Sequence, residues 1–237
     1  MVAGRNRRRA LVDALVADEL DRRRRAPGGD DVLSVLLAAT DEHGAPAYTD
    51  RQVTDELRGL VVAGHETTAT ALAWVVHLLA HHPAEQAELI RSLDAGETAY
   101  LGAVIKETMR FRPSVFDAVR TATGDTTLGG QPVPRGAIVS ALFTVTHHDA
   151  ALWGDPGVFR PERHLDGRPV PYALTPFGGG VRRCLGAALA QLELEVVLKE
   201  LLGRFRLEPA GGRLEAARLQ GVTIVPSRGG RVVLRPR

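Results

Sequence analysis

The chain contains a single cysteine, Cys184, at the end of a glycine-rich loop. Three successive glycines, 178–180, precede it, and Arg182 and Arg183 stand directly before it. An apolar segment with helical periodicity begins at Leu185, and the unpaired amides of a helix start, together with neighbouring arginines, favour the thiolate form of a cysteine. One thiolate cannot build an iron–sulfur cluster or a zinc knuckle, but it can be the single protein ligand of a haem iron. Glycines leave the approach free of side chains for a flat cofactor.

A second group with chemical potential, Glu66, Thr67 and Thr68, interrupts an apolar helical pattern. Gly64, just before it, costs a helix up to about 1 kcal/mol relative to alanine. Threonine hydroxyls can bond to the carbonyl four residues back and loosen the helix, which opens a groove for a small ligand or water. An acid and a hydroxyl beside a haem face would deliver protons to bound dioxygen. Taken alone, the same residues fit a solvated helix face equally well.

The third group is Glu107 and Arg110, which are three residues apart and therefore neighbours on one helical face. Pairs of this kind are common on protein surfaces and contribute little there. The spacing by itself leaves a surface pair and a buried pair open.

The loop around the cysteine resembles the haem-binding loop of the cytochrome P450 family. Six residue types match at fixed spacing: Phe177, Gly178, Gly180, Arg182, Cys184 and Gly186. The resemblance implies that Cys184 is the axial ligand of haem b, with Phe177, Gly178, Arg182 and Gly186 beside the cofactor. The alternative for a lone cysteine is a small buried hydrophobe.

Two further segments resemble motifs of the same family. The resemblance of the segment from Ala63 to Thr68 implies that Thr67 contacts dioxygen and Glu66 begins a proton relay, with Ala63, Gly64 and Thr68 beside the haem. In the family the Glu-x-x-Arg pair is buried and is joined by a later arginine.

For this chain, the same resemblance implies a structural lock made of Glu107, Arg110 and Arg163. It also nominates Arg182 and Arg120 as partners of the haem propionates, a task that suits the planar fork of arginine. A solvated strand position is the alternative for Arg120. Residues that would border the substrate are Val115, Phe116, Val119, Val222 and Thr223.

The elements that position these residues are mostly helices. Periodicity and capping signals predict helices over residues 11–20, 30–39, 49–82, 83–93 and 100–110. Short β-prone pieces between glycines and prolines over 121–139 predict small hairpins. A helix over 185–202, with apolar residues at 185, 189, 192 and 196, is followed by a hairpin that pairs residues 222–225 with 232–234. The expected fold is mainly α with small β-sheets, a cytochrome P450-like fold lacking its N-terminal part.

We expect one domain over residues 1–237, with helices over 1–112, a β-prone region over 113–140, a meander and haem-binding loop over 141–186, and a terminal helix and hairpin over 187–237. The resemblance covers only the later part of the family's chain, so segments that roof the substrate pocket in the family are expected to be missing. A truncated product, a piece of a longer chain and a misassigned start all stay open.

Composition narrows the remaining classes. The 30 basic residues include only two lysines, and the formal net charge is +2. Because no aromatic residues accompany the arginine runs near the N-terminus, nucleic-acid binding is not expected. No apolar stretch is long enough to span a membrane, and the arginine-rich start is unlike a signal peptide. With a single cysteine there is no internal disulfide, which fits the cytoplasm.

Other catalytic classes lack their signatures. His77 and His81 have the spacing of a zinc-protease helix, but Leu78 stands where the glutamate base belongs. The glycine run is not followed by the residues of a phosphate loop, and the histidines form no recognisable cysteine-hydrolase arrangement.

The expected function is therefore that of a haem-thiolate monooxygenase, which inserts one oxygen atom of O2 into a lipophilic organic substrate. Its electrons would come from a ferredoxin or a flavoprotein reductase. The alternative is a non-catalytic remnant of the family or a helical interaction module.

Overall fold

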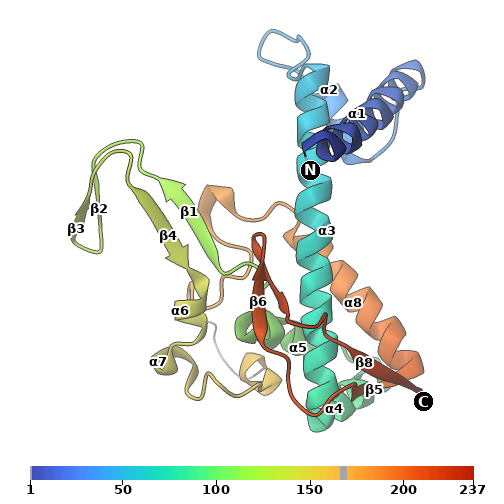
Figure 1. The fold of residues 1–237 in the computed structure, drawn as a ribbon, viewed down its shortest axis with the longest axis vertical. Helices are drawn as coiled ribbons and strands as arrows, with labels where there is room; N and C mark the ends of the chain where they lie inside the picture. The colour runs from blue at the N-terminus through green and yellow to red at the C-terminus, as the bar shows by residue number, and fades with distance from the viewer. Residues whose placement is uncertain (1, 166–169) are drawn as a thin grey trace. The chain divides into compact units, whose positions relative to one another are not determined.

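A computed structural model describes residues 2–165 and 170–237 (Figure 1). It is rich in helices, as predicted, and its strands form small sheets. The α-helices are α1 (Val2–Arg25), α2 (Val32–Ala38), α3 (Asp50–His81), α4 (Pro83–Asp94), α5 (Ala99–Phe111), α6 (Phe143–His147), α7 (Ala150–Trp153) and α8 (Ala187–Arg204). Two 3-10 helices, η1 (Pro161–His164) and η2 (Gly180–Arg182), flank the segment that leads to Cys184.

The chain divides into two compact units, residues 1–65 and 66–237, and the division falls inside α3. The first unit has a small core of Leu20, Leu33 and Val53. Helix α2 begins as the sequence predicts, because the Asp31 carboxylate accepts a hydrogen bond from the Ser34 amide at 2.9 Å. Helix α1 is longer than the predicted 11–20 and continues through the arginine run to Arg25.

The second unit is organised around one core that α3, α4, α5 and α8 share. Its fully buried members come from residues far apart in the sequence: Val75, Leu78, Leu79, Leu89, Leu101, Val104, Ile105, Leu198 and Leu202. Burial of this apolar surface is the main stabilising contribution to the unit. The C-terminal half of α3 is thereby fixed against α5 and α8.

The buried face of α8 is not the one that the predicted helix pattern picked out. Leu189, Leu192 and Val196 are largely exposed, whereas Leu194, Leu198 and Leu202 are buried. Because α8 carries apolar residues on more than one face, periodicity alone does not decide which face packs. The core of α3, α4 and α5 selects the face at 194, 198 and 202.

The strands between α5 and α6 form nested hairpins. Strand β1 (Asp117–Thr121) pairs with β4 (Ile138–Leu142), and between them β2 (Thr126–Leu128) pairs with β3 (Gln131–Val133). The loop between β2 and β3 consists of Gly129 and Gly130, both at positive φ, which glycine adopts without steric cost. The predicted small hairpins are therefore confirmed.

The predicted terminal hairpin is wrong. Strand β7 (Thr223–Pro226) pairs with β6 (Ala217–Gln220), and β8 (Val232–Pro236) pairs with β5 (Phe205–Pro209), directly after α8. The turn between paired strands lies at Gly221, with φ +59°. A second turn, in which the Gly229 amide donates to the Pro226 carbonyl, leads to β8, which does not pair with β7.

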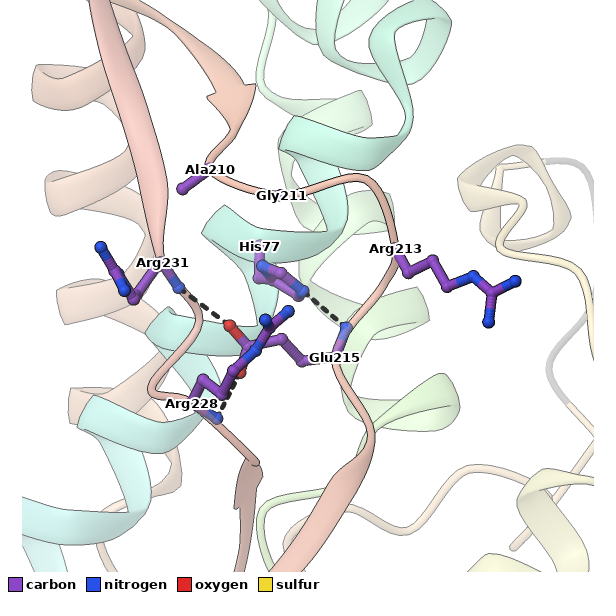
Figure 2. Close-up of a pocket in the computed structure, with 7 residues that line it drawn as sticks. All are labelled: His77, Ala210, Gly211, Arg213, Glu215, Arg228 and Arg231. Atoms are coloured by element: carbon purple, nitrogen blue, oxygen red, sulfur yellow. Dashed lines mark hydrogen bonds between the residues drawn. The ribbon is translucent and has the colours of Figure 1, made fainter.

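A buried carboxylate, that of Glu215, binds backbone amides of the segment after β7. Glu215 accepts hydrogen bonds from the backbone amides of Arg228, Gly230 and Arg231, and its own amide donates to Nε2 of His77 at 2.9 Å (Figure 2). These amides are therefore not available for a hairpin between β7 and β8. Burial, and secondarily the nearby His81, lowers the pKa of His77. A small solvent-open cavity lies here, lined in part by His77 and Glu215, and we assign this cluster a structural role.

Among the described helices, none combines the length and the apolar character that a membrane crossing requires.

Gln86 on α4 joins the helices to the β5–β8 sheet. Its buried amide nitrogen donates to the carbonyls of Leu79 and Leu207, and its oxygen accepts the amide of Leu207. We predict that Gln86→Ala lowers the free energy of unfolding by about 2 to 4 kcal/mol, because buried backbone groups lose their partners. Urea unfolding measures this loss. Gln131→Ala, on the exposed β3, is the control and should change little; equal effects of the two would contradict the assignment.

Candidate active site

The loop that carries Cys184 is closed by backbone hydrogen bonds. The Cys184 amide donates to the Phe177 carbonyl at 2.9 Å, and the Arg183 amide donates to the Gly180 carbonyl at 3.1 Å. Gly178 and Gly180 have φ of +69° and +65°, values that side chains rarely permit. The cysteine is a free thiol and is exposed. The loop thus presents one sulfur atom at a fixed point of the backbone.

Helix α8 begins at Ala187, three residues after the cysteine. Gly186 is its N-cap and has no side chain to bond the first amides. No hydrogen bond found among the described residues uses the amides of Leu185 or Gly186. These amides and the helix dipole favour a negative charge at the helix start.

Two apolar side chains close to Cys184 in the sequence are exposed. Val181 is 102% exposed and Leu185 is 87% exposed, and a Cβ added at Gly180 or Gly186 would meet no atom within 4 Å. A flat, apolar cofactor can therefore lie against the backbone at this place and cover both side chains. Phe177 packs against the main core and anchors the start of the loop.

The acid and hydroxyl residues lie on α3. Glu66, Thr67 and Thr68 are half-buried and belong to the second unit. Ala63 and Gly64 are exposed and belong to the first unit. The Glu66 carboxylate accepts a hydrogen bond from the Thr223 hydroxyl at 3.2 Å, a contact between residues 157 positions apart. Sequence reasoning placed Thr223 at the substrate, and the structure buries it completely.

Glu107 on α5 is the most heavily bonded carboxylate of the site region. It is fully buried and accepts hydrogen bonds from Nε and Nη2 of Arg110 at 2.9 and 2.8 Å. It also accepts hydrogen bonds from Nε of Arg163 at 3.1 Å and from the Arg160 amide at 2.9 Å. His164 Nε2 lies 2.8 Å from the second carboxylate oxygen. The structure therefore brings Glu107, Arg110 and Arg163 together in a buried cluster. His164 joins it, and no sequence pattern predicted a role for that residue.

Burial alone would raise the pKa of Glu107, but hydrogen bonds from Arg110, His164 and the Arg160 amide bring that pKa down to about 2. The carboxylate is therefore ionised at every physiological pH. Removing a cationic partner would leave an uncompensated charge in the interior, which is strongly destabilising.

The same cluster fixes the segment that leads to the cysteine loop. Arg110 Nη1 donates to the carbonyls of His147 and Pro156 at 2.8 and 3.0 Å, and Arg163 also donates to backbone carbonyls of this segment. His147 is fully buried at the end of α6. Its Nε2 accepts the amide of Thr175, two residues before Phe177, at 3.1 Å.

Comparisons with known proteins identify the family of the chain. The family model described as Cytochrome P450 matches residues 5–230. The chain belongs to the cytochrome P450 family. A putative cytochrome P450 135B1 of Mycobacterium bovis is 40% identical over 238 residues, which cover 97% of this chain and 50% of that protein. A putative cytochrome P450 137 of Mycobacterium tuberculosis is 41% identical over 206 residues, covering 87% of this chain and 43% of that protein.

Solved P450 structures share the fold. A retinoic acid-bound cyanobacterial CYP120A1 superimposes with a TM-score of 0.89 at 29% identity, covering 98% of this chain and 57% of that chain. A CYP102L1 structure gives a TM-score of 0.85 at 28% identity, with 99% and 58% covered. The predicted P450-like fold is thereby confirmed. The chain spans about half the length of the curated relatives it matches.

Membership of the P450 family implies haem, and the residues present fit this cofactor. The exposed thiol of Cys184 can serve as a donor to the haem iron. The glycines near it leave space for the cofactor, and the exposed apolar side chains are a surface that a haem can cover. Among the described residues, no three His, Cys, Asp or Glu side chains gather as a metal site. The assignment of Cys184 as the protein donor to iron stays a prediction.

The remaining predicted site residues lie at the surface or close to it. Arg182 is exposed and has no ion pair within the described parts of the chain. Arg120 is exposed on β1, and its Nη1 donates to the Val119 carbonyl. Val119 and Val222 are exposed, whereas Val115 and Phe116 are half-buried. The assignment of these residues to propionates and substrate stays a prediction.

The buried cluster at Glu107 yields a stability prediction with a matched control. Glu107→Ala should lower the free energy of unfolding by roughly 3 to 5 kcal/mol, because Arg110 and Arg163 remain buried without their anion. Glu88 and Arg91 on α4 have the same i, i+3 spacing but are exposed, so Glu88→Ala should cost no more than about 1 kcal/mol. Chemical denaturation of both variants decides the matter, and similar losses would mean that the Glu107 cluster is open to water.

His147 predicts an acid-dependent loss of stability. Burial, followed by repulsion from His148 and Arg110, lowers the pKa of His147 from 6.5 to about 4. A group with a lowered pKa in the folded state stabilises the fold above its unfolded pKa, and this stability disappears as the pH falls from 6.5 through 4. The loss for this residue amounts to roughly 3 kcal/mol over that window.

The measurement is urea unfolding between pH 7.5 and pH 4. His147→Gln keeps an acceptor for the Thr175 amide but does not titrate, so its stability should fall less steeply with acid than that of the parent chain. His43→Gln, at an exposed histidine, serves as the control. Parallel curves for the parent and His147→Gln would show that His147 does not titrate in this window.

Proposed function

We propose that this chain supplies the haem-binding residues of a haem-thiolate monooxygenase that inserts one oxygen atom of O2 into a lipophilic organic substrate. The observation that carries the proposal is the exposed Cys184 just before α8, in a loop closed onto Phe177 and followed and preceded by the exposed apolar residues Leu185 and Val181. Family membership supports haem monooxygenase chemistry in general.

When bound, haem b supplies the oxygen-activating chemistry. Cys184 provides the thiolate that holds the iron, and the amides at the start of α8 stabilise its negative charge. Phe177, Gly178 and Gly186 shape the backbone beside the cofactor. Arg182 and Arg120, which have no carboxylate partner among the described residues, bind the propionates through their guanidinium forks.

Proton delivery falls to α3. Glu66 takes protons from water, and the Thr67 hydroxyl passes them toward the oxygen molecule. Ala63, Gly64 and Thr68 lie on the same helix. Val115, Phe116, Val119 and Val222 border the substrate. Because these side chains are apolar, they favour a lipophilic substrate over a charged one.

Electrons come from a ferredoxin or a flavoprotein reductase. Arg183 and Arg182 stand next to the cysteine and are exposed, and they present positive charge to an acidic partner. Such a partner would associate more weakly as the ionic strength rises. We place the protein in the cytoplasm, where these donors operate.

The test of the proposal is the ligand of the iron. Haem-loaded protein, reduced and exposed to carbon monoxide, should show the strongly red-shifted Soret band of thiolate ligation. Cys184→Ser should abolish that band while the fold is retained, as judged by circular dichroism. A red-shifted band that survives in Cys184→Ser, or one that never appears in the parent, would exclude the proposed site.

A further inference from the structure

The acid of the proposed proton relay is held by a hairpin turn from the far end of the chain. Thr223 Oγ1 donates to Glu66 Oε1 at 3.2 Å, and Gln220 Nε2 donates to the same oxygen at 3.4 Å. Both donors belong to the turn between β6 and β7. Gln220 and Thr223 lie 154 and 157 positions away from Glu66 in the sequence, so no sequence motif links them to it.

This turn is anchored independently of Glu66. Gln220 and Thr223 face each other across a two-residue loop with Gly221 at φ +59°. The indole nitrogen of Trp74, which is completely buried on α3, donates to the Ile224 carbonyl, and the Ile224 amide donates to the Ser114 carbonyl, both at 2.8 Å. The turn therefore keeps a fixed position beside the helix that carries Glu66.

The orientation of the two donors is also determined. Gln220 Oε1 accepts Arg218 Nη2 at 2.8 Å, which directs its amide nitrogen toward Glu66. Thr223 has no exposed surface, so the single proton of its hydroxyl is shared between Glu66 Oε1, 3.2 Å away, and the Gln220 carbonyl, 3.0 Å away. Among the described residues, Glu66 Oε2 has no hydrogen-bond partner. One carboxylate oxygen is thus fixed while the other stays available.

We propose that Thr223 and Gln220 are positioning residues for Glu66: they hold Oε1 and leave Oε2 to take up and release the proton. A proton that Oε2 accepts from water and hands on returns Glu66 to its carboxylate form, so no further reactant is consumed. The inference rests on the proposed function, since it specifies how the acid of that relay is oriented.

The functional test measures the hydrogen peroxide released for each NADPH oxidised. Haem-loaded protein is supplied with a plant-type ferredoxin, its reductase and 1-dodecanol, which is uncharged, as the lipophilic probe. Thr223→Val, which keeps the shape of the side chain, should raise the peroxide share about fivefold, the factor that corresponds to one hydrogen bond of ordinary net strength. Thr223→Ser should restore the parent value. Thr126→Val, at an exposed strand position, is the control and should match the parent.

The variant Glu66→Gln tests the acid role of Glu66 separately from the positioning role of Thr223. If Glu66→Gln raises the peroxide share and Thr223→Val does not, the positioning role is wrong and the acid role stands. If Glu66→Gln leaves the share unchanged, both are wrong. Failure of Thr223→Ser to rescue the Thr223→Val effect would also overturn the positioning role, because the hydroxyl would then not be the cause.

A second readout needs no cofactor. In a double-mutant cycle of Glu66→Ala and Thr223→Val, the two changes should be coupled by about a fivefold factor in the unfolding equilibrium constant. Additive effects would mean that the two side chains do not interact, and would overturn the inference whatever the turnover data show.

Discussion

The buried carboxylate of Glu107 is the interaction on which the site region depends. An ionised carboxylate without water is tolerated only when charges and donors surround it, and here Arg110, Arg163 and the Arg160 amide do so. The donors come from α5 and from η1 with its N-cap residue; the strands β1 to β4 and the helices α6 and α7 lie between these elements in the sequence. Satisfying this one charge therefore fixes the segment before the cysteine loop against the main helical core.

In contrast to the buried Glu107 cluster, the cysteine loop exposes its side chains to solvent. Its backbone is fixed, through the bond from the Cys184 amide to the Phe177 carbonyl, but its side chains are uncovered. A fixed backbone with an exposed thiol and exposed Val181 and Leu185 is costly for a chain alone, since apolar surface remains in water. The arrangement makes physical sense for a surface that an apolar cofactor covers.

The sequence was sufficient where a local pattern determines the structure. The spacing around Cys184, the capping by Asp31 and the i, i+3 pair at Glu107 each follow from residues close together in the chain. It was insufficient where partners are distant. The burial of His147, the pairing of β8 with β5, and the contact between Glu66 and Thr223 depend on which elements meet in space, and no periodicity encodes that choice. For α8, apolar residues on several faces left its buried face undetermined.

The central claim is that the Cys184 sulfur ligates the haem iron. X-ray absorption at the iron edge, recorded on haem-loaded protein, tests it most directly because it identifies the atoms bound to the metal. If Cys184 is the ligand, the spectrum shows one sulfur scatterer in the parent protein and none in Cys184→Ser. A spectrum of the parent that contains only nitrogen and oxygen neighbours would contradict it.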